Sequence, residues 1–113
     1  MVGETNKRKY PRASIRWPVT LKTATADNIK AHSGNLSAGG AYIHCDQALN
    51  PGELLDLTIE PPHRPSLQII AEVIWTRGAS PVGMGVRFLE ISENDCHFLN
   101  NIVLDHLRKE PKE

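Results

Sequence analysis

The chain has 113 residues, 40% of them hydrophobic and 23% charged, and its formal net charge is zero. These values are ordinary for a single soluble globular domain with one modest core. No apolar run approaches the roughly 20 residues of a transmembrane helix, and the N-terminus lacks the apolar stretch of a secretory signal. With only Cys45 and Cys96, far apart in the chain, we expect reduced thiols and a cytoplasmic protein.

The charge is unevenly distributed along the chain. Residues 1–30 carry seven Lys and Arg against two Asp and Glu, a net charge of +5, and residues 31–113 carry six against eleven, a net charge of −5. A neutral protein with a basic N-terminus is a poor candidate for a general polyanion binder. This distribution favours one local site for a small anion, or a basic arm that meets its own acidic body.

Residues 1–12 are predicted to form a flexible basic arm, with its positive charge in Lys7–Arg12. Pro11 disfavours helix for the residue before it and favours an extended conformation. An extended chain rises about 3.3 Å per residue, and alternate side chains share a face. Arg8 and Arg12 therefore face the same side, roughly 13 Å apart by the same rise. That separation could span a ligand the size of a dinucleotide.

Alternating apolar and polar residues, separated by Gly and Pro turns, predict six short strands. Pro18 indicates an edge position or a bulge in the first of them. In the longest strand the alternation places Trp75 on the same face as Ile69 and Val73. Trp75 is therefore interpreted as a core or edge aromatic rather than a stacking platform. The predicted strands cover 15–23, 29–36, 41–45, 55–60, 67–77 and 84–88.

The C-terminal region is predicted to be helical. Ser92 and Asp95 have the spacing of a capping box, and apolar residues then recur at helical intervals up to Leu107. The helix is expected to end near Arg108, with 109–113 as a solvated tail. Together these elements predict a mainly β domain over residues 13–108, a small six-stranded antiparallel β-barrel with a C-terminal α-helix.

The turn between the second and third predicted strands reads Asn35-Leu-Ser-Ala-Gly-Gly40. The Asn35 amide can read a base edge or hold the turn, and Ser37 adds a hydroxyl. Gly39 and Gly40 permit positive φ and close approach of a ligand to exposed backbone N–H groups. Arginine side chains upstream would suit phosphate and guanine.

The two segments together resemble the paired signature of the PilZ domain, a bacterial receptor for cyclic di-GMP. The family pattern is R-x-x-x-R, followed some twenty to thirty residues later by D/N-x-S-x-x-G. This chain has Arg8 and Arg12, then Asn35, Ser37 and Gly40. The first motif alone carries little weight, but the two in order, on a matching strand pattern, are a strong signal.

The resemblance continues through most of the chain, over about residues 7–108. A strand that ends in Trp75, the Gly83–Phe88 strand and the terminal helix are all similar to that family's six-stranded barrel. The resemblance implies a receptor that binds cyclic di-GMP, needs no other cofactor and performs no catalysis. Ligand binding would order the arm and change the contacts with a protein partner, in a motility, polysaccharide or other signalling pathway.

The resemblance also implies roles for individual residues. Arg8 and Arg12 would bind phosphate and guanine, Asn35 and Ser37 would contact guanine, and Gly40 would shape the turn. Asn35 occupies a position that is often Asp, so charge-assisted bonding to guanine is weaker. Arg77 and Arg87 are surface charges that could reach the ligand. Secondary contacts are expected from Lys7, Lys9, Gly39 and Arg77.

Other functions have weaker support in the sequence. His44–Cys45 and Cys96–His97 lack the spacing of zinc ligands, so no metal site is predicted, and no catalytic arrangement stands out. One alternative is a PilZ-like protein-interaction module that no longer binds ligand. Another is a single-stranded nucleic-acid-binding barrel, which needs an aromatic and basic groove; the chain has six aromatic residues, most of which fit core positions.

Overall fold

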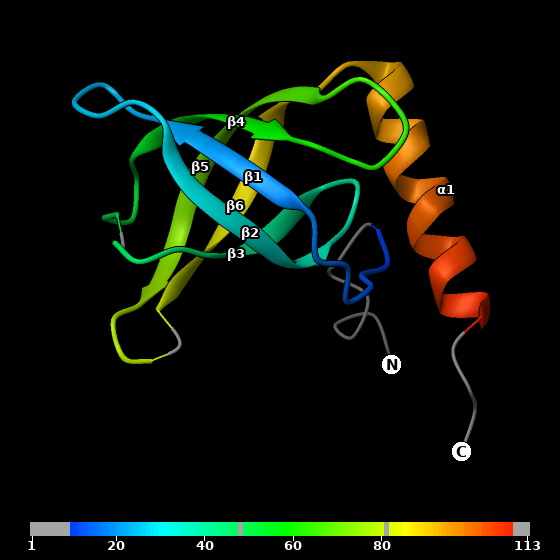
Figure 1. The fold of residues 1–113 in the computed structure, drawn as a ribbon, viewed down its shortest axis with the longest axis horizontal. Helices are drawn as coiled ribbons and strands as arrows, with labels where there is room; N and C mark the ends of the chain where they lie inside the picture. Colours follow the sequence, from blue (N-terminus) through cyan, green and yellow to red (C-terminus); the bar gives the residue numbers. More distant parts are fainter. Residues whose placement is uncertain (1–9, 48, 81, 110–113) are drawn as a thin grey trace, which may run out of the picture.

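The computed structural model describes residues 10–47, 49–80 and 82–109. Predictions for Lys7, Arg8, Lys9 and the tail beyond 109 therefore lie outside the described residues. Six antiparallel strands close into a barrel in the order β1-β2-β3-β6-β5-β4, and one helix follows (Figure 1). The predicted barrel with a C-terminal helix is confirmed. The elements are β1 Pro18–Lys22, β2 Ile29–Leu36, β3 Gly40–His44, β4 Leu54–Ile59, β5 Leu67–Arg77, β6 Gly83–Glu90 and α1 Glu93–Lys109.

The barrel interior is filled by alternate side chains of every strand, as a half-buried antiparallel sheet requires. In β1, Val19 and Leu21 point inward opposite Ile59 and Leu57 of β4. Each such aliphatic side chain contributes about 1.5–3 kcal/mol by its burial. Among the described residues, the largest fully buried side chains are Val19, Leu21, Leu36, Ile43, Leu55, Leu57, Ile59, Leu67, Val73, Met84, Leu99 and Val103.

The first strand begins later than predicted. The sequence predicts a strand from Ile15, but the regular β1 begins at Pro18. The segment before Pro18 is held to β2 partly by side-chain hydrogen bonds. Ser33 of β2 is fully buried, and its hydroxyl donates to the Ile15 carbonyl at 2.6 Å and accepts from the Trp17 N–H at 3.0 Å. The Ser33 side chain therefore takes the place of part of the backbone ladder, beside the backbone bond from the Ser33 N–H to the Trp17 carbonyl at 3.0 Å.

The same segment is also tied to the far end of β2. Ala13 and Leu36 exchange both backbone hydrogen bonds, at 3.0 and 2.9 Å. Since Ala13 directly follows Arg12, the chain is held against β2 from the residue after the predicted arm. The position of Arg12 relative to the barrel is therefore set by β2.

β5 contains a bulge that the alternation did not predict. Its pairing with β6 shifts between Val73 and Trp75. Ile69 and Val73 are buried, as expected, but Ile74 and Trp75 are both exposed, at 46% and 49%. The predicted placement of Trp75 on the face of Ile69 and Val73 is therefore wrong. The extra residue at the bulge turns the end of the strand so that the indole lies on the outer surface.

α1 begins at the predicted cap. The Asp95 N–H donates to the Ser92 hydroxyl at 3.1 Å. The Asp95 carboxylate lies 3.5 Å from the guanidinium of Arg64, in the β4–β5 loop, so the acidic residue of the capping box also ties the helix to the barrel. The helix ends at Lys109, one residue beyond the predicted end.

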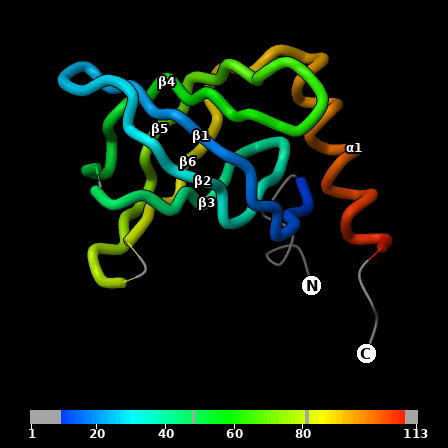
Figure 2. The backbone as a smooth tube through the Cα atoms, in the orientation of Figure 1, coloured from blue at the N-terminus to red at the C-terminus, as the bar shows by residue number. Residues whose placement is uncertain are grey.

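α1 lies at the end of the barrel that carries the β2–β3 turn and the β4–β5 loop (Figures 1 and 2). Leu99 and Val103 are fully buried in this contact. Phe98 stacks on Trp17 with 6.3 Å between ring centroids, and the Arg64 guanidinium lies 3.9 Å from the centre of the Phe98 ring. Among the residues that the structure describes, no helix is long and apolar enough to cross a membrane.

Ser33→Ala is expected to destabilise the fold by roughly 1–3 kcal/mol, because it leaves the Ile15 carbonyl and the Trp17 N–H without their partner. Urea unfolding followed by circular dichroism would measure the free energy of unfolding. Ser66→Ala, at an exposed position, is the matched control. Equal stability of the two variants would contradict the role assigned to Ser33.

Candidate ligand-binding site

Ser37 organises the turn between β2 and β3. Its side chain is buried, and its hydroxyl oxygen accepts from the N–H groups of Gly39 and Gly40, both at 3.1 Å. Its own N–H donates to the Gly40 carbonyl at 2.9 Å. The expectation that the N–H groups of this turn are exposed to a ligand is therefore wrong, because they point inward to Ser37. The contact of Ser37 with guanine stays a prediction.

Gly40 is required for steric reasons rather than for its backbone conformation. Neither Gly39 nor Gly40 has a positive φ, so the conformational freedom that glycine permits is not used here. Gly40 pairs with Arg87 across β3 and β6, and a Cβ at Gly40 would overlap the Val86 carbonyl oxygen of β6. The neighbouring Gly39 carbonyl accepts from the Phe88 N–H at 2.9 Å. The glycine therefore allows β3 and β6 to come together where the barrel meets the turn.

Asn35 holds the strand pairing at a bulge in β2. The register between β2 and β3 shifts between Ser33 and Asn35. The Asn35 side-chain oxygen accepts from the Tyr42 N–H at 3.2 Å. Of the two roles left open by the sequence, holding the local structure is the one seen, and no described residue bonds the Asn35 amide nitrogen. Reading of a base edge by Asn35 stays a prediction.

A surface hollow of about 390 Å³ lies between the end of the arm, the β2–β3 turn and the outer face of β3, β5 and β6. Its volume falls within the range of small-molecule sites. Of the predicted site residues, Arg12, Ser37, Gly39 and Gly40 line this hollow. Asn35 does not line it. The described residues that line it are Tyr10, Arg12, Ser37, Gly39, Gly40, Ala41, Tyr42, Ile74, Trp75, Gly85, Val86 and Arg87.

Trp75 forms an aromatic wall of this hollow. Its ring stacks on Tyr42 with centroids 5.2 Å apart and an interplanar angle of 24°. It also lies against Gly85 of β6, where a Cβ would come within 2.6 Å of the indole Cε2. With 49% of Trp75 exposed, the indole offers apolar surface to a planar ligand.

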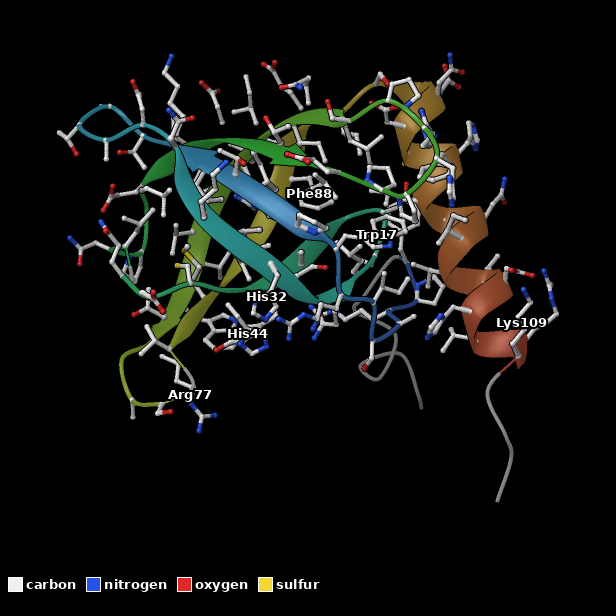
Figure 3. The ribbon with its side chains drawn as sticks, viewed as in Figure 1. Trp17, His32, His44, Arg77, Phe88 and Lys109 are labelled. Atoms are coloured by element: carbon white, nitrogen blue, oxygen red, sulfur yellow. The ribbon has the colours of Figure 1, made fainter. Side chains whose placement is uncertain are left out.

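The cations around the hollow differ in their surroundings. Arg12 is exposed and lines it. Arg87 also lines it, and its guanidinium bonds the Glu72 carboxylate at 2.7 Å. Arg77 lies outside the lining, near the β5–β6 loop (Figure 3), and its guanidinium bonds the carbonyls of Ala79 and Ser80 at 3.4 Å. The structure therefore brings Arg12, and not Arg77, to the turn.

Tyr10 connects the arm to both the turn and the helix. A Cβ at Gly39 would lie 3.2 Å from the Tyr10 ring, and the Cys96 thiol of α1 donates to the Tyr10 hydroxyl at 3.8 Å. This interaction with Cys96 raises the pKa of Tyr10 above its ordinary value. Tyr10 therefore bridges the β2–β3 turn and α1.

The two cysteines are free thiols in separate surroundings. Cys45 is buried, its thiol donates to the Gln47 carbonyl at 2.9 Å, and burial raises its pKa. In the part of the chain that the structure describes, no three His, Cys, Asp or Glu side chains gather as metal ligands would.

Sequence reasoning missed part of this lining. Tyr10 and Tyr42 were not singled out, and Trp75 was interpreted as a core or edge residue. The signal available was the Gly83-Met-Gly85 pattern, because two glycines on one face of a strand leave room for flat rings. At Gly83 a Cβ would come within 2.5 Å of the Tyr42 hydroxyl.

The fold and the hollow define the class as a small β-barrel module with a surface hollow between Arg12 and a Ser-Gly turn. Residues 6–105 match the PilZ domain family. The chain belongs to this family, as the sequence resemblance predicted. No curated protein matches the chain in sequence.

Solved structures share the fold. The Bacillus subtilis inhibitor of motility (MotI/DgrA) has a TM-score of 0.81 at 24% identity, over 94% of this chain and 54% of that one. Escherichia coli YcgR in complex with c-di-GMP has a TM-score of 0.76 at 20% identity, over 91% and 47%. The PilZ domain of YcgR with c-di-GMP has a TM-score of 0.72 at 18% identity, over 92% and 94%. The chain spans about half the length of the first two.

Gly40→Ala is expected to destabilise the barrel by roughly 1–3 kcal/mol, because the added methyl group forces β3 away from the Val86 carbonyl. Guanidinium unfolding would report the loss. Gly78→Ala is the control, since nothing lies within 4 Å of a Cβ at that position. If Gly40→Ala proved as stable as Gly78→Ala, the steric role of Gly40 would be wrong.

Proposed function

We propose that this chain is a receptor for cyclic di-GMP with no catalysis of its own. The observation that carries the proposal is one hollow lined by the Arg12 side chain, the Ser37–Gly40 turn and the exposed ring of Trp75. Membership of the PilZ family supports it. So do the two Escherichia coli YcgR structures, which contain c-di-GMP.

The lining suits the chemistry of this ligand. A cyclic guanine dinucleotide presents phosphodiesters and planar purines. The Arg12 guanidinium can bind phosphate through two parallel N–H bonds or stack on guanine. The Trp75 ring can stack on a purine, an interaction worth about 1–3 kcal/mol per base. Arg8, which lies outside the described residues, is proposed to add a second guanidinium from the arm.

The proposed signal is a change in the arm. Tyr10 already contacts the turn at Gly39 and the helix at Cys96. A ligand held between Arg12 and Trp75 adds contacts to the arm and stabilises it on the barrel. The shift can be no larger than the difference in ligand affinity between the two arm states. A protein partner would then meet an altered surface beside α1; the motility role named for MotI supports a partner in motility.

Isothermal titration calorimetry with cyclic di-GMP tests the proposal. Arg12→Ala is expected to lose about 10–150-fold in affinity, because it removes a charged hydrogen-bonding group. Trp75→Ala is expected to lose roughly 5–150-fold through stacking. Arg108→Ala, at an exposed position at the end of α1, should bind as the parent does. No saturable heat from the parent at tens of micromolar would refute the proposal.

Asn35→Asp is expected to strengthen cyclic di-GMP binding by up to about tenfold. One carboxylate oxygen keeps the bond to the Tyr42 N–H, and the other accepts from a guanine N–H with the help of its charge. Asn101→Asp, exposed on α1, controls for added negative charge. Unchanged or weaker affinity in Asn35→Asp alone would show that this side chain does not face guanine.

One observation favours a second candidate, an interaction module that no longer binds ligand. Ser37 and Gly40 are fully accounted for by the turn and by the closure of the barrel, so these positions would be kept without a ligand. Amide exchange at Tyr10 and Arg12 distinguishes the two. Protection that rises with cyclic di-GMP supports the receptor, and unchanged protection supports the interaction module.

A further inference from the structure

A second hollow, of about 690 Å³, lies on the barrel surface beside β2 and β3. An adjoining hollow of about 250 Å³ shares Arg16, His32 and His44 with it. Of the paired PilZ signature residues that the structure describes, Arg12, Asn35, Ser37 and Gly40, none lines either one. The residues that line the larger hollow are Arg16, Lys30, Ala31, His32, His44, Cys45, Asp46, Ser80 and Val82. We call it the histidine pocket.

The two histidines are positioned by packing. His32 of β2 and His44 of β3 are paired across the strands, and their ring centroids lie 5.0 Å apart (Figure 3). Tyr42 meets the His44 ring edge-on at 4.9 Å. A Cβ at Gly34 would come within 2.5 Å of His44 Nε2, so the glycine lets the imidazole lie down on β2. The rings are therefore held in place before any ligand arrives.

The pocket concentrates positive charge. Among the ion pairs of the described residues, none involves Arg16, Lys30, His32 or His44. Asp46 is the one acidic side chain in the described lining. Burial, the nearby Arg16 charge and the His44 charge all lower the pKa of His32. A bound anion would therefore stabilise the positive charge of the groups that line this pocket.

We propose that the histidine pocket binds a phosphate-type oxyanion, as a site separate from the candidate cyclic di-GMP site. Arg16 supplies a planar fork of donors, and Lys30 adds a flexible ammonium group. Each protonated imidazole adds a charged N–H donor, and its ring is held in position by the contacts among His32, His44 and Tyr42. Free phosphate and the phosphate group of a nucleotide share this chemistry, and the test separates them.

Binding is expected to depend on pH. The groups that face His32 are Arg16 before β1, Lys30 on its own strand, and His44, Cys45 and Asp46 from β3 and its end. The lowered pKa means that, without an anion, the folded protein disfavours the charged form of His32. A bound oxyanion favours that form, so binding takes up protons and strengthens as the pH falls from 7.5 toward 6. The Cys45 thiol stays neutral in this range, because burial raises its pKa.

The experiment follows the imidazole carbon-bound protons of the full chain by NMR while pH and anion are varied. Inorganic phosphate is the probe, and sodium chloride keeps the ionic strength constant. Saturable binding that raises the pKa of His32 and shifts the ring signals of His44 supports the proposal. We expect affinity several-fold higher at pH 6 than at pH 7.5 when it is expressed per phosphate dianion, because phosphate itself takes up a proton over this range. Shifts that do not saturate, or that chloride reproduces at equal ionic strength, overturn it.

Variants make the test specific. Arg16→Gln is expected to weaken phosphate binding about tenfold, and Lys30→Gln gives a second test at an exposed position. Arg108→Gln is the control for general charge loss, and an equal effect there overturns the proposal. A parallel titration with 5′-GMP distinguishes the two sources of phosphate. If 5′-GMP binds more tightly than inorganic phosphate, the pocket is assigned to a nucleotide-borne phosphate. If the two bind equally, the pocket is assigned to the free anion.

The outcome is independent of the cyclic di-GMP proposal. Arg12→Ala, which targets the candidate ligand site, should leave phosphate binding at the histidines unchanged. Failure of cyclic di-GMP to bind leaves this test intact, and loss of phosphate binding in Arg12→Ala contradicts a separate site.

Discussion

The close contact of β3 with β6 is the constraint on which the rest of this domain depends. At Gly40 the two strands approach so closely that no side chain fits between the Cα and the Val86 carbonyl. The strand pairing there closes the barrel and also brings Arg87 and Trp75 to the same surface as the β2–β3 turn. The buried Ser37 hydroxyl bonds the turn internally, and so the turn keeps its shape without a ligand. The strand pairing that closes the barrel, the β2–β3 turn and the candidate ligand site therefore lie together at one corner of the molecule.

Most of the fold could be predicted from the sequence, because it depends on side-chain periodicity. Alternation predicted all six strands, and helical spacing behind Ser92 predicted α1. The failures fall where a single residue breaks the pattern. Before Pro18 the Ser33 hydroxyl replaces a backbone donor, and between Val73 and Trp75 an inserted residue reverses the face. Neither event changes the composition of its strand, so periodicity cannot reveal it.

The site could be predicted in part. The paired motifs identified the family and located Arg12 and the turn, which the structure places around one hollow. Motif spacing could not show that Asn35 is engaged with the Tyr42 backbone or that Arg77 lies outside the lining. It also could not reveal Trp75 as a wall of the hollow, because that depends on the bulge in β5 and on the space above Gly85. Pairs of residues from different strands determine these features.

The bonding of Ser37 has a consequence for how family signatures are interpreted. A serine whose hydroxyl is buried and fully engaged, and a glycine kept by steric necessity, are retained by selection for folding alone. Over evolutionary time, this half of the signature would persist whether or not a lineage bound a ligand. Arg12 and the Trp75 ring line the same hollow through exposed side chains, and under the proposed function these are the groups that meet the ligand. Under the proposed function, divergence at these two positions is therefore the better record of whether a descendant binds a nucleotide.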